Sequence, residues 1–578
     1  MHDLVIRGGT VVDGTGAPPF QADVAIDTGV VTQVGPVHGR GREEIDAAGR
    51  LVTPGFVDIH THYDAQAVWE QRFSPSSDHG VTTVVAGNCG VGVAPCGADK
   101  RELLISVAAG VEDIPENILR GAMPWGWETF PQYLDVLAGR SFDADLAVQI
   151  AHGPIRIHVM GQRGADREPA NAQDLATMTA IVREALEAGA IGVSSSRMTF
   201  HRRLDGALAP CETASEEELL ALARGVREAG RGVFEMISDF NDLPLGGTTD
   251  FDLLCRIARQ GGCPLSVTLV QVPQHPEVWK TLLQLMEQAN RDGVRIKGQV
   301  APRANGMLFN LDFAYHPFCF HPSYQTIAAL PLAQRIAELR KPELRARILA
   351  EQPDHPNPAM VMVVSWVERM FVLGDPPDYE PPPERSLGAI AQQRGASPWE
   401  VAYDLLTAGD GGTVLFLPAS NYSHGTLDAV LEMLRSPYTV LGLGDGGAHY
   451  GFICDSSFPT FLLTHWVRDR SRGERVDLPW AVRTLTRDTA ESVGLMDRGL
   501  LAPGYRGDAN VIDFERLQLR APRTVYDLPL GGRRLVQQAQ GYAATIVGGA
   551  VTYRDGQATG ALPGRLIRGQ RAAPGRSA

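Results

Sequence analysis

Two histidines, His60 and His62, follow an apolar run near the start of the chain, in the segment PGFVDIHTH (54–62). In a β-strand, side chains two positions apart point to the same face. Two neutral imidazoles held in this way can bind one divalent metal ion and leave coordination positions open for water. Two exposed loop histidines would give the same letters, but the apolar strand and the Pro-Gly pair before them favour a metal site.

An aspartate, Asp445, ends a second apolar run, in the segment VLGLGDGGAH (440–449). In a barrel of parallel strands the carboxyl ends of all strands open at the same mouth. Asp445 and His60 can therefore meet there although they are far apart in the chain. A carboxylate in that position can contact a metal ion and take a proton from an attacking water. The alternative is a structural Asp-Gly turn.

A sheet of parallel strands is needed to bring these residues together. Short apolar, β-branched runs alternate with helix-like segments through the middle of the chain, and this alternation predicts a parallel sheet. Eight such runs suggest a closed barrel, and a ninth at 414–417 leaves the count open. The eight runs cover 52–59, 80–86, 144–150, 191–195, 233–237, 265–267, 294–296 and 440–443.

Capping residues mark the ends of several expected helices. Ser215, with Glu218 three positions later, predicts a capping box for a helix that ends at Gly230. The segment SPWE (397–400) predicts a second capping box, with proline in the first helical position. A third helix is expected from about 174 to 187, before a glycine.

The two ends of the chain differ from its middle. The first fifty residues and the stretches near 508–514 and 542–552 hold short β-branched runs broken by glycines. The segment 297–411 contains two proline clusters and is predicted to be an insertion over one face of the larger unit. We therefore expect one domain built from residues 1–52 and 500–570, and a second domain from 53–499.

Composition narrows the class of protein. A balance of 44% apolar and 21% charged residues over 578 positions excludes global disorder. A net charge of -14 argues against a nucleic-acid partner and against docking on anionic membranes. Seven cysteines without a CxxC pair favour reduced thiols, and no secretory signal is recognised. We expect a cytoplasmic protein that acts on a small molecule, with self-association into a homo-oligomer left open.

The segments TPGFVDIHTH, GVTTVVAGNCG and DGGAH resemble those of the N-acyl-D-amino acid deacylases (D-aminoacylases) of the amidohydrolase superfamily. The likeness continues through the flanks, including APGYRGDANVIDF, and so covers most of the chain. The resemblance implies an α/β fold, a distorted (β/α)8 TIM-type barrel with a small β-sandwich domain built from both termini. It also implies zinc, with His60, His62 and Cys89 as ligands and Asp445 as ligand and catalytic aspartate.

The chain departs from that family at two strands. In D-aminoacylases the fifth and sixth strands each end in a histidine that helps the cysteine to hold a metal ion. Here these strands read GVFEMISD (232–239) and PLSVTL (264–269), without a histidine. One zinc ion is therefore expected rather than two, with Cys89, Glu235 or Asp239 as additional ligands. A plain buried thiol is the alternative for Cys89.

Other polar residues at expected strand ends are candidates for substrate binding. An arginine at the mouth of a barrel can bind a substrate carboxylate through two hydrogen bonds, and a structural ion pair is the alternative. His449 is expected to orient the Asp445 carboxylate. The residues expected at the substrate are Arg197, Arg303, His152 and Arg156.

These expectations predict a metal-dependent hydrolase that cleaves the amide bond of an N-acyl-amino acid, in the D configuration, or of a related amide. Asp445 would act first as general base and then as general acid. Two alternatives stay open. The barrel either acts on a cyclic amide or catalyses a metal-assisted lyase or isomerase step on a specialised metabolite, or it is a non-catalytic binding protein on a degraded barrel.

Overall fold

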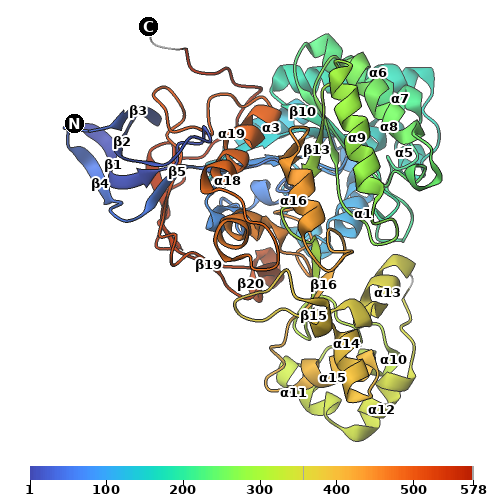
Figure 1. Ribbon diagram of the computed structural model, residues 1–578. Helices are drawn as coiled ribbons and strands as arrows, with labels where there is room; N and C mark the ends of the chain where they lie inside the picture. The colour runs from blue at the N-terminus through green and yellow to red at the C-terminus, as the bar shows by residue number, and fades with distance from the viewer. Residues whose placement is uncertain (356, 576–578) are drawn as a thin grey trace.

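The computed structural model describes residues 1–355 and 357–575 and shows a mixed α/β chain (Figure 1). Nine parallel strands near its centre form two sheets, ordered β6-β7-β8 and β9-β10-β11-β12-β13-β17. Only Gln149 separates β8 from β9, and its N–H donates to Ala86 of β7. The strands are β6 (Phe56–Asp58), β7 (Val81–Ala86), β8 (Asp145–Val148), β9 (Ile150–Ala151), β10 (Gly192–Arg197), β11 (Val233–Ser238), β12 (Leu265–Thr268), β13 (Ile296–Val300) and β17 (Thr439–Leu441).

The first and last of these strands are joined just beyond their carboxyl ends. Thr61 forms a parallel bridge with Gly446. The N–H of His62 donates to the Gly446 carbonyl at 2.7 Å, and the N–H of Asp445 donates to the His60 carbonyl at 3.0 Å. The strands therefore follow one another in a closed ring, and both expected motifs lie at the joint.

Two strand predictions are corrected by the pairing. The run 52–59 is divided at Gly55, and its first half, β5 (Leu51–Pro54), belongs to another sheet. Glycine is needed at position 55, since a Cβ atom there would lie 2.1 Å from the Thr82 hydroxyl oxygen. The ninth run forms β16 (Leu415–Pro418), which pairs antiparallel with β14 (Gly306–Phe309) and β15 (Phe371–Val372). It is not a strand of the ring.

The expected helices form, with one difference in capping. The helix predicted near 174–187 is α6 (Ala172–Ala188), and Gly189 follows it. The helix predicted at 397–400 is α15 (Pro398–Thr407), which has the complete capping box of Ser397 and Glu400. In α7 (Glu216–Ala229) only half of the box is present, since Ser215 accepts from the Glu218 N–H. The Glu218 carboxylate instead points inward and contacts the buried side chains of His152 and Arg156.

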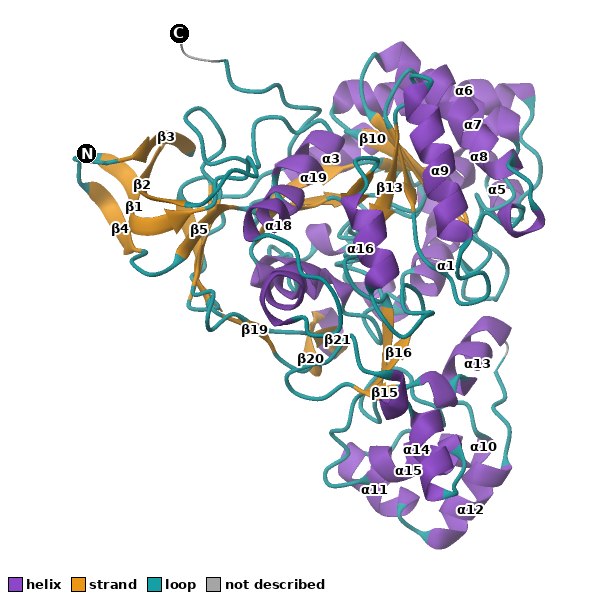
Figure 2. Cartoon of the chain, in the orientation of Figure 1, coloured by secondary structure: helices purple, strands orange, loops and turns teal. Residues whose placement is uncertain are grey.

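Both ends of the chain contribute to one nine-stranded sheet beside the ring (Figure 2). Its strands β1 and β5 lie next to each other, and β5 pairs with a strand from the far end of the chain. The members are β1 (His2–Val11), β2 (Phe20–Asp27), β3 (Val30–Gly35), β4 (Gly41–Asp46), β5, β18 (Ala509–Ile512), β23 (Tyr542–Val547), β24 (Ala550–Arg554) and β25 (Gln557–Ala558).

Between β13 and β17 the chain leaves the ring and builds a helical lobe, seen at the bottom of Figure 1. The lobe has an apolar core of its own, and its first and last strands, β14 and β16, pair at Gly306 and Pro418. Among residues 1–355 and 357–575, no helix is both long and apolar enough to cross a membrane. The lobe helices are α10 (Pro322–Gln325), α11 (Leu332–Leu339), α12 (Pro342–Ala350), α13 (Pro358–Ser365), α14 (Leu387–Arg394) and α15.

Candidate metal centre

Four side chains from three strand ends converge at the joint of the ring. His60 Nε2 lies 3.2 Å from Cys89 Sγ and 3.5 Å from Asp445 Oδ1. His62 Nε2 lies 3.6 Å from the same carboxylate oxygen. The ligand atoms of the two histidines and the cysteine all lie within 4.8 Å of one another, and all three residues are buried. The sequence motifs that we expected to meet are therefore brought together.

Backbone geometry explains how these side chains reach one point. His60 and His62 continue the line of β6, so both imidazoles lie on one side of it. Cys89 and Asp445 follow β7 and β17 and have φ angles of 56° and 50°, which turn the chain sharply at both strand ends. Gly447 is needed beside Asp445, because a Cβ atom there would approach the His62 backbone to 2.8 Å.

A second polar group faces the Nδ1 atom of each histidine. His60 Nδ1 lies 2.7 Å from Gln299 Oε1, and the Gln299 amide N–H₂ donates to Ser266 at 2.8 Å. His62 Nδ1 faces Glu112 Oε1 at 3.4 Å. In both rings a proton on Nδ1 would leave the Nε2 lone pair directed at the centre.

Buried carboxyl groups surround the four side chains. Burial raises the pKa of Asp58 to about 8 and of Glu235 to about 8, and in both cases the negative charge of Asp445 adds to the effect. Burial likewise raises the pKa of Asp64 to about 7 and of Glu112 to about 7. Glu235 Oε2 accepts the Cys89 N–H at 2.8 Å, whereas its Oε1 and Asp58 Oδ2 are buried without a partner. A bound cation would lower these pKa values and favour the ionised carboxylates.

Cys89, His60 and Gln299 also have the order of a nucleophile, a base and an orienting group. The electrostatics oppose that role. Burial and the charges of Glu235 and Glu112 raise the pKa of Cys89 well above its usual range. Burial lowers the pKa of His60 to about 4. A thiolate–imidazolium pair is therefore disfavoured, and the thiol would need a metal ion to deprotonate it.

The donor atoms suit a divalent metal ion. Two imidazole nitrogens, one sulfur and one carboxylate oxygen form the mixed set that zinc accepts, whereas magnesium and calcium prefer oxygen alone. Buried carboxyl oxygens without a hydrogen-bond partner lie nearby, and a bound cation would favour their ionised form. The residues present therefore fit a metal ion of the zinc type.

The residues expected at the substrate do not lie together. Arg156 binds both oxygens of Glu218 at 2.9 and 2.8 Å, and His152 reaches the same carboxylate at 2.7 Å. Arg303 donates to Asp455 at 2.6 Å. Arg156, His152 and Arg303 are all buried, and each has a carboxylate partner within the chain.

Arg197 differs from the other three. Its side chain is 28% exposed, it lies 3.5 Å from Asp250, and it donates to the Ala214 carbonyl at 3.1 Å. His449 lies close to the centre, with its ring centroid 6.5 Å from that of His62. Its Nδ1 atom is buried without a partner, so the expected hydrogen bond to Asp445 is not formed from that nitrogen.

Two carboxyl groups of the centre had a signal in the sequence that we did not use. Asp58, His60, His62 and Asp64 alternate at every second position, and a run of this kind places all four side chains on one side. Glu112 had no such signal, because it follows α1 (Arg101–Val111) at a helix end remote from both motifs.

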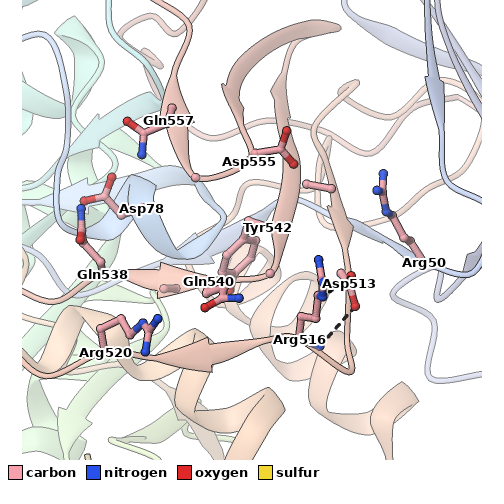
Figure 3. Close-up of a pocket in the computed structure, with 14 residues that line it drawn as sticks. Arg50, Asp78, Asp513, Arg516, Arg520, Gln538, Gln540, Tyr542, Asp555 and Gln557 are labelled. Atoms are coloured by element: carbon pink, nitrogen blue, oxygen red, sulfur yellow. Dashed lines mark hydrogen bonds and ion pairs between the residues drawn. The ribbon is translucent and has the colours of Figure 1, made fainter. Parts of the chain in front are cut away.

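A separate polar pocket of about 380 Å³ lies at the sheet formed by the two chain ends (Figure 3). Arginine and aspartate side chains line it, including Arg50, Arg520, Asp78 and Asp555. None of the four side chains of the candidate metal centre lies among its lining residues.

Comparisons with known proteins agree with this arrangement. A family model described as "Amidohydrolase family" matches residues 43–553. The chain is 24% identical to a D-aminoacylase of Alcaligenes xylosoxydans xylosoxydans, over 98% of this chain and 97% of that protein. The solved structure of a D-aminoacylase with a binuclear metal center has a TM-score of 0.65 and 24% identity, covering 98% of this chain and 100% of the other. An N-acyl-D-glutamate deacylase from Bordetella bronchiseptica, complexed with zinc and a phosphonate inhibitor, has a TM-score of 0.64 and 23% identity, covering 98% and 99%. The fold is thus shared with deacylases over nearly the whole chain.

Proposed function

Because this chain belongs to the amidohydrolase family, we propose that it hydrolyses the amide bond of an N-acyl-amino acid, in the D configuration, with the help of one metal ion. The observation that carries the proposal is the position of Asp445, whose Oδ1 lies 3.5 Å from His60 Nε2 and 3.6 Å from His62 Nε2. The similarity to D-aminoacylase over most of both chains supports the choice of substrate class.

The proposal includes the architecture around the centre. The closed ring of parallel strands is taken as a distorted (β/α)8 TIM-type barrel of residues 53–499. The insertion predicted at about 297–411 is taken as the lobe between β14 and β16, since β13 extends to Val300 within the ring. Residues 1–52 and 500–570 are taken as the small β-sandwich domain. The strand order of the ring and the pairing of β5 with β18 support this division.

We assign the metal ion to zinc, held by His60, His62, Asp445 and Cys89. When bound, such an ion lowers the pKa of a water molecule and polarises the scissile carbonyl. A single ion is favoured because β11 and β12 lack the two histidines of the family pattern, and Glu235 occupies the interior of the ring instead. Loss of neutral ligands from one metal position weakens binding there.

Asp445 acts on protons in this proposal. Although burial alone would raise its pKa, the His62 imidazole, 3.6 Å away, holds the pKa of Asp445 well below its usual range. The carboxylate is therefore ionised and can accept a proton from the attacking water. It then delivers that proton to the departing nitrogen, as general base and general acid in turn.

Of the four residues expected at the substrate, Arg197 is assigned to the substrate carboxylate. Its guanidinium keeps exposed surface, whereas Arg156, His152 and Arg303 are enclosed by their own partners. Those three are assigned to holding the strand ends that carry the centre. His449 is assigned to shaping the wall beside His62. A cytoplasmic location is also proposed, since all seven cysteines are free and buried.

Metal analysis and substrate screening test the proposal on the full chain. Protein purified without chelator is expected to contain about one equivalent of zinc, to lose activity on chelation and to regain it with zinc. A panel of N-acetyl-D-amino acids, their L isomers and hydantoins separates the hydrolytic options. Turnover of hydantoins alone would favour a cyclic-amide hydrolase. Protein that is purified without metal and neither binds added zinc nor gains activity with it would favour a binding protein.

A further inference from the structure

We propose that Glu112 is a positioning residue for the metal centre, which fixes the orientation of the His62 imidazole. The inference rests on the proposed metal-dependent function and extends it to a residue outside the ligand set. Glu112 is 3% exposed and follows the last turn of α1, which lies next in the chain after the segment that carries Cys89.

The contact between the two side chains is direct. Glu112 Oε1 faces His62 Nδ1 at 3.4 Å, which is an ion-pair distance and not a hydrogen bond, and neither atom has a hydrogen-bond partner in the described part of the chain. The other ring nitrogen of His62 faces Asp445 Oδ1 at 3.6 Å. An imidazole has one N–H and one lone pair when neutral. A carboxylate beside Nδ1 favours the ring orientation in which Nε2 points at the centre, where it would be available to a metal ion.

The backbone of the same residue holds the other half of the centre. The Glu112 carbonyl accepts the N–H of His449 at 2.5 Å. The next residue, Asp113, accepts the Gly451 N–H at 2.9 Å. The end of α1 therefore contacts both the segment that carries His62 and the loop that follows Asp445. Glu112 makes the first contact with its side chain and the second with its backbone.

The second histidine is held differently. His60 Nδ1 faces the neutral amide oxygen of Gln299 at 2.7 Å. A carboxylate partner makes an imidazole a stronger electron donor than an amide partner does. We therefore expect the Glu112 side chain to contribute more to metal affinity than the Gln299 side chain does, and to contribute through His62.

The test measures metal affinity in Glu112→Gln and Glu112→Ala, made in the full chain. Chelator-stripped protein is titrated with Co²⁺ alone, and binding is followed by the visible absorption of the bound ion. Loss of an orienting partner typically weakens metal binding about 10- to 100-fold. The weakening is expected to lie at the lower end of that range for Glu112→Gln, which keeps an acceptor oxygen, and at the upper end for Glu112→Ala. At saturating metal, kcat is expected to recover to within a few-fold of wild type, which separates positioning from catalysis.

A matched control comes from a second buried carboxylate–histidine pair. Glu380 lies 2.7 Å from His465 and shares no contact with the centre in the described part of the chain. Glu380→Gln is expected to leave the Co²⁺ affinity unchanged. Circular dichroism checks the fold of each variant, and Glu112→Gln carries the test if the alanine variant does not fold.

Two outcomes are distinguishable from each other. Co²⁺ affinities of both folded Glu112 variants within twofold of wild type would overturn the role of Glu112 while leaving the metal site intact. Failure of the wild-type protein itself to bind Co²⁺ would instead overturn the proposed function on which the inference rests.

Discussion

Asp445 and His60 contact each other twice. The Asp445 N–H donates to the His60 carbonyl at 3.0 Å, and its carboxylate lies 3.5 Å from the His60 imidazole. The first contact joins the ends of the ring of strands, and the second assembles the centre. Closure of the fold and formation of the site are thus one event, so substitutions that keep the backbone contact isolate the chemistry of the carboxylate.

Replacement of Asp445 by asparagine is expected to reduce kcat by about a hundredfold to ten-thousandfold, because the amide can neither accept nor deliver the proton. Asparagine tolerates the left-handed backbone at this position, where φ is 50°, so the fold is expected to persist. Initial rates with an N-acetyl-D-amino acid and a melting curve measure both effects.

Asp555→Asn is the matched control, since Asp555 also has a positive φ of 47° and lies on the exposed β24–β25 turn. Its activity should equal that of wild type. Full activity in Asp445→Asn would remove the carboxylate from the mechanism.

The role of Cys89 is decided by a serine substitution. If the thiolate is a ligand, Cys89→Ser weakens zinc binding by about tenfold or more, because a serine hydroxyl is a poor ligand at neutral pH. Zinc affinity by competition with a chromophoric chelator gives the answer. Cys255→Ser is the control, since that thiol is buried on α8 (Thr249–Gly261) away from the centre. Equal zinc affinity in Cys89→Ser and wild type would make Cys89 a plain buried thiol.

Two arginines that looked alike in the sequence are expected to respond differently. Arg197→Ala should raise KM for an N-acyl-amino acid by about 10- to 100-fold with little loss of stability, because it removes a charge-assisted hydrogen bond to substrate. Arg156→Ala should cost about 3 kcal/mol of stability, because it leaves the buried Glu218 carboxylate without its cation.

Steady-state kinetics and thermal melting of the two variants measure this contrast. An unchanged KM in Arg197→Ala would show that another group binds the substrate carboxylate.

Stability below neutral pH depends on Glu380. Although burial would raise its pKa, hydrogen bonds from His465 and Arg470 lower the pKa of Glu380 from 4.5 to about 2. A lowered folded-state pKa stabilises the protein above the unfolded value, and the gain is lost as pH falls from 4.5 towards 2. Glu380→Gln should therefore cost about 3 kcal/mol at pH 7.

The difference between Glu380→Gln and wild type should shrink by about 1.4 kcal/mol at pH 3.5. Melting curves of both proteins between pH 7 and 3.5 check this dependence. A difference that stays constant over that range would mean that the carboxylate is not ionised in the folded protein.

The sequence predicts those residues of the site that lie at strand ends, but not the partners that other elements supply. His60, His62 and Asp445 were expected to converge because strand ends share one side of a parallel sheet, and the Nε2 atoms of both histidines lie 3.5 and 3.6 Å from Asp445 Oδ1. Partners supplied by other elements could not be found in this way. Glu218 faces Arg156, and Glu112 faces His62, across gaps in the chain that no periodic pattern spans.

The extent of a strand is also predicted only in part by its β-branched residues. The run 294–296 marked the start of β13, but the strand continues to Val300 through Gly298 and Gln299, which lack β-branched side chains. Gln299 holds its place because its amide binds His60 and Ser266, and this tertiary contact outweighs local propensity.

The helical lobe departs from and returns to the body of the protein at one place, since Gly306 and Pro418 are direct neighbours on paired strands. An exchange of this lobe for one from a relative would therefore need two cuts a few ångströms apart. Such chimaeras would retain every assigned metal ligand, all of which lie outside the exchanged segment. Such chimaeras would test whether the lobe or the ring determines substrate preference.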